Sequence, residues 1–106
     1  MKASRSDKRV KVLKAMAHPS RLAMLEALAN GEKCVCELQK LVGSDISTVS
    51  KHLSLMKMAG LVEDRKEGLW VHYRLRVPCV LQFMHCIEAV LEGEARKARL
   101  TTCSRT

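Results

Sequence analysis

Five cysteines are the residues of this chain with the most chemistry to offer. Two of them stand one residue apart in Cys34-Val35-Cys36, and the other three are Cys79, Cys86 and Cys103. An odd number argues against a framework in which every cysteine is paired, and structural disulfides are not expected in a reducing compartment. The thiols can then be small buried apolar groups, ligands of a soft metal ion, or redox-active groups. All three roles stay open on the residues alone.

The spacing of the cysteines limits which of them can act together. Side chains at i and i+2 of a regular helix point about 200° apart, so Cys34 and Cys36 can hold one ion only where a helix begins or is distorted. Cys79 and Cys86 are seven residues apart, two turns along one helix face and too far for one ion, and we expect both to be buried at a dimer interface. No cysteine is accompanied by His and carboxylate in a nucleophile pattern, and we therefore expect no enzyme.

The composition indicates a small helical domain with a polyanionic partner. The chain has 106 residues, of which 47% are apolar but only one each is Trp, Tyr and Phe, so its core must be aliphatic and rich in Met. A core of this size is modest and is often completed by dimerisation. The formal net charge of +8 favours nucleic acid as the partner. No apolar run approaches the roughly 18 residues of a membrane span or forms a signal peptide, so we expect a cytoplasmic protein without a membrane partner.

Apolar periodicity predicts that most of the chain is helical. The expected helices are a first that ends near His18, a second that begins with Pro19 and ends at Ala29, a third over residues 36–41, a fourth from 45 or 47 to about 59, and a last one after Pro78 with a broad apolar face. The side chain of His18 is expected to cap the second helix. Gly43-Ser44-Asp45 is expected to form a tight turn between the third and fourth helices.

Between the fourth and the last helix the periodicity changes to that of strands. Residues 61–65 and 69–75 are rich in strand-forming types, and residues 66–68 have the length and the glycine of a hairpin loop. The fold class is therefore mainly α with a small β-hairpin. We expect one domain over residues 1–106, in which 1–7 and 95–106 are flexible.

Two helices joined by a short glycine-containing turn, followed by a basic hairpin, are typical of a winged helix-turn-helix. The second helix of such a unit lies in the major groove, and its N-terminus attracts phosphate. The hairpin can contact phosphates or the minor groove. The predicted DNA-contacting residues are Ser47, Thr48, Ser50, Lys51 and His52 on the helix and Arg65, Lys66, His72 and Arg74 on the hairpin.

Four segments carry a family resemblance. They are Ala17-His18-Pro19-Ser20-Arg21-Leu22, Cys34-Val35-Cys36-Glu37-Leu38, Ser47-Thr48-Val49-Ser50-Lys51-His52-Leu53 and Gly68-Leu69-Trp70-Val71-His72-Tyr73-Arg74-Leu75. In this order and spacing, over roughly residues 8–92, the chain resembles the ArsR/SmtB family of bacterial metalloregulators. The resemblance implies a winged-helix homodimer whose first and last helices form the interface. It also implies a repressor that leaves a double-stranded DNA operator when an inducer binds.

The Cys34-Val35-Cys36 segment resembles the thiolate box of the arsenic- and cadmium-sensing branches, which lies on the helix before the recognition helix. Such a box implies a thiophilic inducer, first As(III), with Sb(III), Cd(II) and Pb(II) as further candidates, and no organic cofactor. The arsenic-sensing pattern has a third cysteine where this chain has Gln39. Cys103 is our candidate for the third ligand, with Cys79 and Cys86 as alternatives. His85, Glu88, Glu92 and Glu94 do not reproduce the spacing of the family's zinc and nickel sites.

Two other functions remain open on the sequence. The same fold could respond to oxidation of two thiols instead of binding a metal ion. A DNA-architectural protein without an inducer would bind with a steep salt dependence but little preference for an operator.

Overall fold

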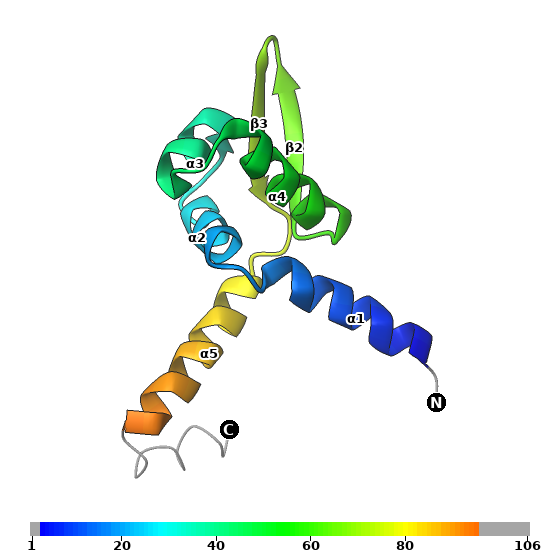
Figure 1. Ribbon diagram of the computed structural model, residues 1–106, viewed down its shortest axis with the longest axis vertical. Coiled ribbons are helices and arrows are strands. Elements are labelled where there is room, and N and C mark those ends of the chain that lie inside the picture. Colours follow the sequence, from blue (N-terminus) through cyan, green and yellow to red (C-terminus); the bar gives the residue numbers. More distant parts are fainter. Residues whose placement is uncertain (1–2, 96–106) are drawn as a thin grey trace.

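The computed structural model describes the backbone of residues 3–95 and the side chains of residues 8–93. Along the chain it contains α1 (Ala3–Met16), α2 (Pro19–Leu28), β1 (Lys33–Cys34), α3 (Val35–Val42), α4 (Ile46–Met58), β2 (Val62–Glu67), β3 (Trp70–Leu75) and α5 (Val80–Ala95). Figure 1 shows a central body of α2, α3, α4 and the hairpin, from which α1 and α5 extend as two arms. The predicted winged helix-turn-helix is confirmed.

The helix boundaries follow local capping chemistry. His18 lies before Pro19 in an extended conformation, and its Nδ1 accepts the backbone N–H of Ser20 at 3.0 Å, so the predicted cap of α2 is confirmed. Gly43 closes α3 with φ +74°, a left-handed conformation that glycine adopts without strain, and its N–H donates to the carbonyl of Gln39. A short turn follows, and α4 begins at Ile46.

The sheet has one strand more than the sequence predicts. Its order is β1-β3-β2, all antiparallel, and β1 is a two-residue strand that pairs Lys33 with Tyr73 and Cys34 with His72. Two residues are too short to leave a periodicity in the sequence. The predicted hairpin loop was also wrong in its position. Glu67 pairs with Trp70, so the loop is Gly68-Leu69, and Gly68 takes the positive φ that a two-residue turn needs at its first position.

The core confirms the predicted aliphatic, Met-rich composition. Its largest fully buried side chains are Met24, Leu25, Leu38, Val49, Leu53, Met56 and Val62. These side chains come from α2, α3, α4 and β2, and α3 packs against both α2 and α4. The inner side of α4 is therefore held in the core, and its polar side faces outward.

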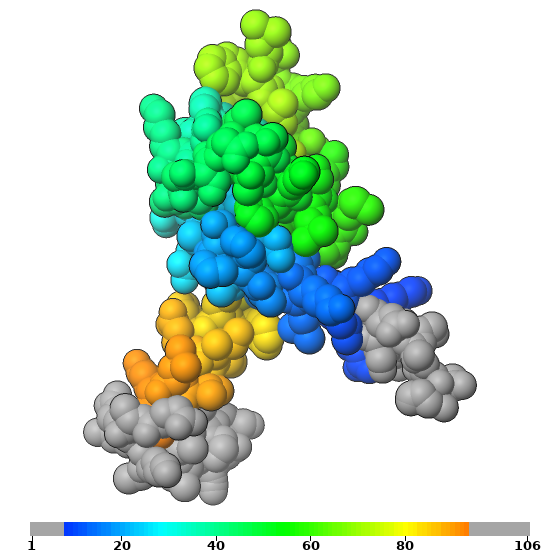
Figure 2. Space-filling view, viewed as in Figure 1, coloured from blue at the N-terminus to red at the C-terminus, as the bar shows by residue number. Residues whose placement is uncertain are grey.

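The two arms make the molecule more extended than a compact domain. Its radius of gyration is 16.0 Å, whereas a compact chain of this length has about 13 Å. The arms expose apolar side chains: Val10 and Leu13 on α1, and Phe83, Ile87, Val90 and Leu91 on α5. Figure 2 shows the coloured parts of the two arms diverging from the body. Within the described residues, no helix is long and apolar enough to cross a membrane.

Candidate thiol site and winged helix-turn-helix

The thiols of Cys34 and Cys36 meet at the junction of β1 and α3. Their Sγ atoms are 2.9 Å apart. Cys34 is extended (φ −83°, ψ 164°) and precedes the first residue of α3, whereas Cys36 lies inside the helix. The pair therefore spans a change from strand to helix, and the divergence of about 200° expected within a regular helix does not arise. The predicted requirement that a helix begin between the two cysteines is met.

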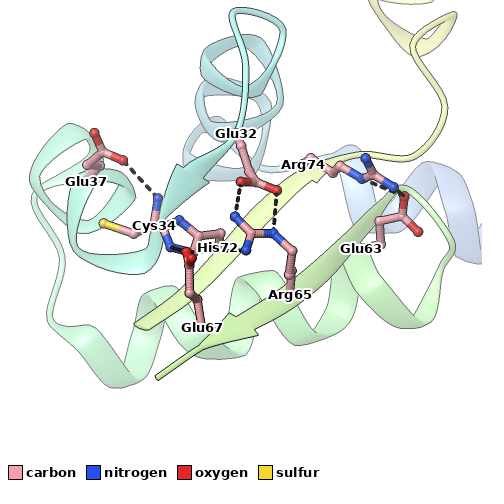
Figure 3. Close-up of polar contacts among 8 residues, drawn as sticks. All are labelled: Glu32, Cys34, Glu37, Glu63, Arg65, Glu67, His72 and Arg74. Carbon is pink, nitrogen blue, oxygen red and sulfur yellow. Dashed lines mark hydrogen bonds and ion pairs between the residues drawn. The ribbon is translucent and has the colours of Figure 1, made fainter. Parts of the chain in front are cut away.

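Figure 3 shows polar groups from α3 and the hairpin around Cys34, one member of this thiol pair. The backbone N–H of Cys34 donates to Glu37 Oε1 at 2.9 Å, which stabilises the start of α3. Directly paired residues of an antiparallel sheet point to the same face, so Cys34 shares the face of His72 on β3. His72 Nε2 is in turn 3.5 Å from Glu67 Oε1. The thiol pair is thus attached to the wing as well as to α3.

The local electrostatics favour the protonated form of the Cys36 thiol. The hydrogen bond between the two thiols raises the pKa of Cys36, and partial burial raises it further. The pKa of Glu37 is lowered, mainly because its carboxylate accepts the backbone N–H of Cys34. A metal ion bound by the sulfur of Cys36 would have to displace its proton, so the affinity for the ion would rise with pH.

The structure brings two of the predicted metal ligands together and does not reach the third. Cys103 lies outside the described residues. Within the described part of the chain, no three His, Cys, Asp or Glu side chains are placed to hold one ion. Cys79 precedes α5 instead of lying on it, so Cys79 and Cys86 do not share one helix face as predicted, and both are exposed in the single chain.

The outward side of α4 carries the polar residues that the sequence predicts to face DNA. Ser47, Ser50 and Lys51 are exposed, Thr48 is half-buried, and Val49 on the inner side is fully buried. Asp45 precedes the helix and accepts hydrogen bonds from Ser47 Oγ at 2.5 Å and Thr48 Oγ1 at 2.7 Å. These two hydrogen bonds lower the pKa of Asp45 to about 2. The hydroxyl protons of Ser47 and Thr48 are therefore engaged within the protein.

His52 is placed differently from the other predicted residues of α4. Its ring centroid is 4.5 Å from that of His18, and its Nδ1 is 2.9 Å from Arg21 Nη1. The ring is half-buried at the junction with α2, and this burial lowers its pKa. Arg21 was not among the predicted functional residues. The available signal was its cationic side chain in the first turn of a helix, where the helix dipole disfavours positive charge.

Carboxylates hold most of the predicted cations of the wing. Arg65 pairs with Glu32 at 2.6 Å and with Glu67 at 3.3 Å, and these contacts raise its pKa. Arg74 pairs with Glu63 at 2.8 Å. Lys66 is exposed and has no ion pair with any residue that the structure describes. Glu32 and Glu63, which the sequence analysis did not single out, thus control the charge of the wing.

Fold and surface together define a winged helix-turn-helix protein with a vicinal thiol pair ahead of its recognition helix. The family model described as "Bacterial regulatory protein, arsR family" matches residues 18–64. The chain is 40% identical over 67 residues to the arsenical resistance operon repressor of Escherichia coli, a match of 62% of this chain and 57% of that protein. It is 41% identical over 68 residues to an uncharacterized HTH-type transcriptional regulator of Methanocaldococcus jannaschii, or 63% of this chain and 76% of that protein.

The solved structures agree with these relatives. A homodimeric winged helix-turn-helix DNA-binding domain from Mycobacterium bovis superposes with a TM-score of 0.76 and 32% identity, covering 90% of this chain and 88% of that one. The chain belongs to the ArsR family, as the resemblance in its sequence predicted. Its relatives are transcriptional regulators, which confirms the expectation that it is not an enzyme. The match spans less than two thirds of the E. coli repressor.

Proposed function

We propose that this chain is a cytoplasmic, homodimeric repressor that a thiophilic ion, first of all As(III), releases from operator DNA. The observation that carries the proposal is the pair of thiols 2.9 Å apart at the junction of β1 and α3. Two adjacent sulfurs are a ligand set for soft ions, and a reducing cytosol keeps them available. The name of the E. coli relative, an arsenical resistance operon repressor, supports As(III) as the first ion to test.

The outward side of α4 and the wing form the proposed DNA surface. Ser47, Ser50 and Lys51 are exposed on the recognition helix, whose N-terminus favours phosphate. Thr48 would use its oxygen as an acceptor. Lys66, Arg65, His72 and Arg74 on the wing would contact the backbone or the minor groove. These residues are within one body with α3, so a change at the thiol pair can reach them.

The arms α1 and α5 are the proposed dimer interface. They expose six apolar side chains, among them Leu13 and Phe83. These two also line an apolar cleft of about 350 Å³ between α1 and the start of α5. Pairing with a second copy would remove this surface from water, and the M. bovis domain is homodimeric. Cys86 would then be covered by the partner, as expected from the sequence.

Binding of an ion to Cys34 and Cys36 would act on two connected elements. α3 packs against α4, so movement of its first turn tilts the recognition helix. β1 pairs with β3, and the adjacent Glu32 holds Arg65 on β2, so the wing moves with the same thiol. We propose Cys103 as the third sulfur ligand for a three-coordinate ion. Cys79 and Cys86 remain alternatives, as do Sb(III), Cd(II) and Pb(II) as inducers.

The proposal is tested by measuring affinity for an operator selected from random duplexes, with and without As(III). We expect As(III) to weaken binding by about 5–150-fold, the range of common allosteric couplings. Cys34→Ser/Cys36→Ser should keep its DNA affinity and lose this response. Cys79→Ser should keep both, because Cys103 is the proposed third ligand; loss of the response in Cys79→Ser would make Cys79 the third ligand instead. Sulfur coordination numbers from X-ray absorption of wild type and Cys103→Ser identify the third ligand. Undiminished release from the double variant would contradict the proposed site.

A thiol-redox response of the same site is the second candidate, favoured by the short distance between the two sulfurs. Peroxide would oxidise both thiols to one disulfide, with two molecules of water formed from H₂O₂ and the two thiol protons. Operator release by peroxide in the presence of a chelator, reversed by dithiothreitol, would support it. Release that needs a metal ion under reducing conditions would exclude it.

A further inference from the structure

Arg21 joins three helices at a point away from the thiol pair. Its Nε donates to the carbonyl oxygen of Ala15 at 2.7 Å, and its Nη2 donates to that of Lys14 at 3.1 Å. Its Nη1 is 2.9 Å from Nδ1 of His52 on α4. One guanidinium on α2 therefore ties the last turn of α1 to the middle of the recognition helix. We call Arg21 and His52, with these two carbonyls, the Arg21 joint.

The Arg21 joint fixes the protonation state of His52. A guanidinium has only donors, so Nδ1 must accept and the neutral ring must carry its proton on Nε2. The groups that face this ring are all unfavourable for a second proton. Arg21 is cationic, with its Nη1 2.9 Å from Nδ1 of the ring, and the ring centroid of His18 lies 4.5 Å away. Burial, His18 and Arg21 accordingly lower the pKa of His52.

The hydrogen-bond partners of Arg21, and not its own helix, favour a cation at this position. It lies in the first turn of α2, where the helix dipole disfavours a cation. The same guanidinium reaches the C-terminal carbonyls of α1, where a cation is favourable and the last carbonyls lack helical partners. Arg21 therefore stabilises the contact between α1 and α4, whereas its charge is unfavourable for α2 itself. Lysine could not replace it, because one ammonium cannot span three acceptors in a plane.

We propose that the Arg21 joint sets the angle between the dimer arm α1 and the recognition helix α4, and that operator binding requires His52 to be neutral. The inference rests on the proposed function as a dimeric DNA-binding protein. In such dimers two recognition helices must enter major grooves about 34 Å apart, so a small tilt of each helix relative to the interface loses contacts at both half-sites. Arg21 lies on α2, and His52 faces Arg21 instead of the outward side of α4. Both are thus positioning residues.

The proposal separates two effects of acid. Protonation makes the protein more cationic and should strengthen binding to any duplex. Protonation of His52 should instead open the Arg21 joint and weaken binding to the operator alone. Because the pKa of His52 is lowered, the ratio of operator affinity to affinity for an unrelated duplex should fall only as the pH drops below the ordinary histidine value of about 6.5. This ratio is the quantity to measure.

Three variants test the Arg21 joint at constant ionic strength. His52→Asn puts a side-chain oxygen at the position of Nδ1, where it can accept from Arg21 but cannot titrate, so we expect operator affinity within about twofold of wild type at pH 7.5 and a ratio that no longer falls with acid. His52→Ala and Arg21→Lys should each lose about tenfold in operator affinity, a coupling of ordinary size, with less loss on the unrelated duplex. His85→Asn, at an exposed histidine on α5, is the matched control and should keep the wild-type profile.

Three further measurements keep the test independent of folding and of the proposed function. Circular dichroism and sedimentation must show that each variant is a folded dimer. The ¹⁵N shifts of His52 in wild type should report a neutral ring with an unprotonated Nδ1 at pH 7.5, with or without DNA. A ring that titrates near the ordinary value of about 6.5 overturns the proposal, as does wild-type operator affinity of His52→Ala. Failure of wild type to bind any selected operator would overturn the proposed function instead.

Discussion

The outward side of α4 and the wing are both proposed to meet DNA, but they hold their cations in different ways. Lys51 on α4 is exposed and makes no ion pair with any residue in the described ranges. On the wing, Arg65 and Arg74 are each bound by carboxylates at 2.6–2.8 Å. One surface presents its charge to solvent, and the other has most of its charge neutralised within the fold.

This difference shows that a count of basic residues overstates what the wing can contribute. Exposed ion pairs are worth only about 0–1 kcal/mol, so DNA phosphates could compete for Arg65 and Arg74 at little cost. Glu32 connects the segment just before the thiol pair with Arg65, so binding of the proposed ion would also change the charge of the wing. The recognition helix would then attract DNA phosphates equally with and without the ion, whereas the attraction of the wing for DNA would change.

The largest effect that tests this comparison is expected for Lys51→Ala. Loss of an unpaired cation should weaken binding to all duplexes by about tenfold at low salt and reduce the slope of log affinity against log salt by about 1. Arg74→Ala is the matched wing variant and should lose less, because Glu63 already offsets its charge. Affinity measured by fluorescence anisotropy at several salt concentrations decides the order. Equal losses would mean that the ion pair on the wing is broken in the complex.

A smaller effect of opposite sign is expected for Glu63→Gln. This change removes a carboxylate from the proposed DNA surface and frees the guanidinium of Arg74, so affinity for operator should rise by about two- to threefold, consistent with the small worth of an exposed pair. Glu26→Gln removes an exposed carboxylate from α2 and serves as the control for net charge. If both variants gain equally, the effect comes from net charge and not from release of Arg74.

The smallest effect is expected on stability, from Asp45. This residue precedes α4, and its carboxylate accepts hydrogen bonds from two hydroxyl groups instead of pairing with a cation. Its pKa is about 2 in the folded protein, below the ordinary 3.8. The stability that it contributes is therefore full above pH 3.8 and is lost as pH falls toward 2. Urea midpoints between pH 5 and 2.5 should fall more for wild type than for Asp45→Asn. Parallel curves for the two proteins would show that Asp45 has no part in this loss.

The sequence predicts the parts of this structure that depend on local chemistry. Gly43 marks the turn between α3 and α4, and Gly68 marks the hairpin, although the hairpin's loop is two residues and not three. The two-residue strand β1 and the pairing of Glu32 with Arg65 depend on contacts between distant segments, so no local pattern indicates them.

At the thiol pair and at His52, the spacing of residues predicts the structure better than the residue types alone. The spacing of Cys34 and Cys36 predicts that they can share an ion only where a helix begins or is distorted, and α3 does begin between them. Position 52 is three residues after Val49 and four before Met56, both fully buried, so helical spacing already indicates an inward ring. Its polar type alone led to the prediction of a DNA contact, whereas the structure places the ring against Arg21 and His18.

The hairpin also places the chain's single tryptophan where it can serve as an optical reporter. Trp70 begins β3, is 58% exposed, and lies opposite Glu67 at the end of the wing. Alternation along β3 puts its indole on the same sheet face as His72 and Cys34. With no second tryptophan to contribute, the emission maximum and its quenching report this one strand. Binding of DNA and of the proposed ion can therefore be tested on the unlabelled protein through the emission of this one tryptophan.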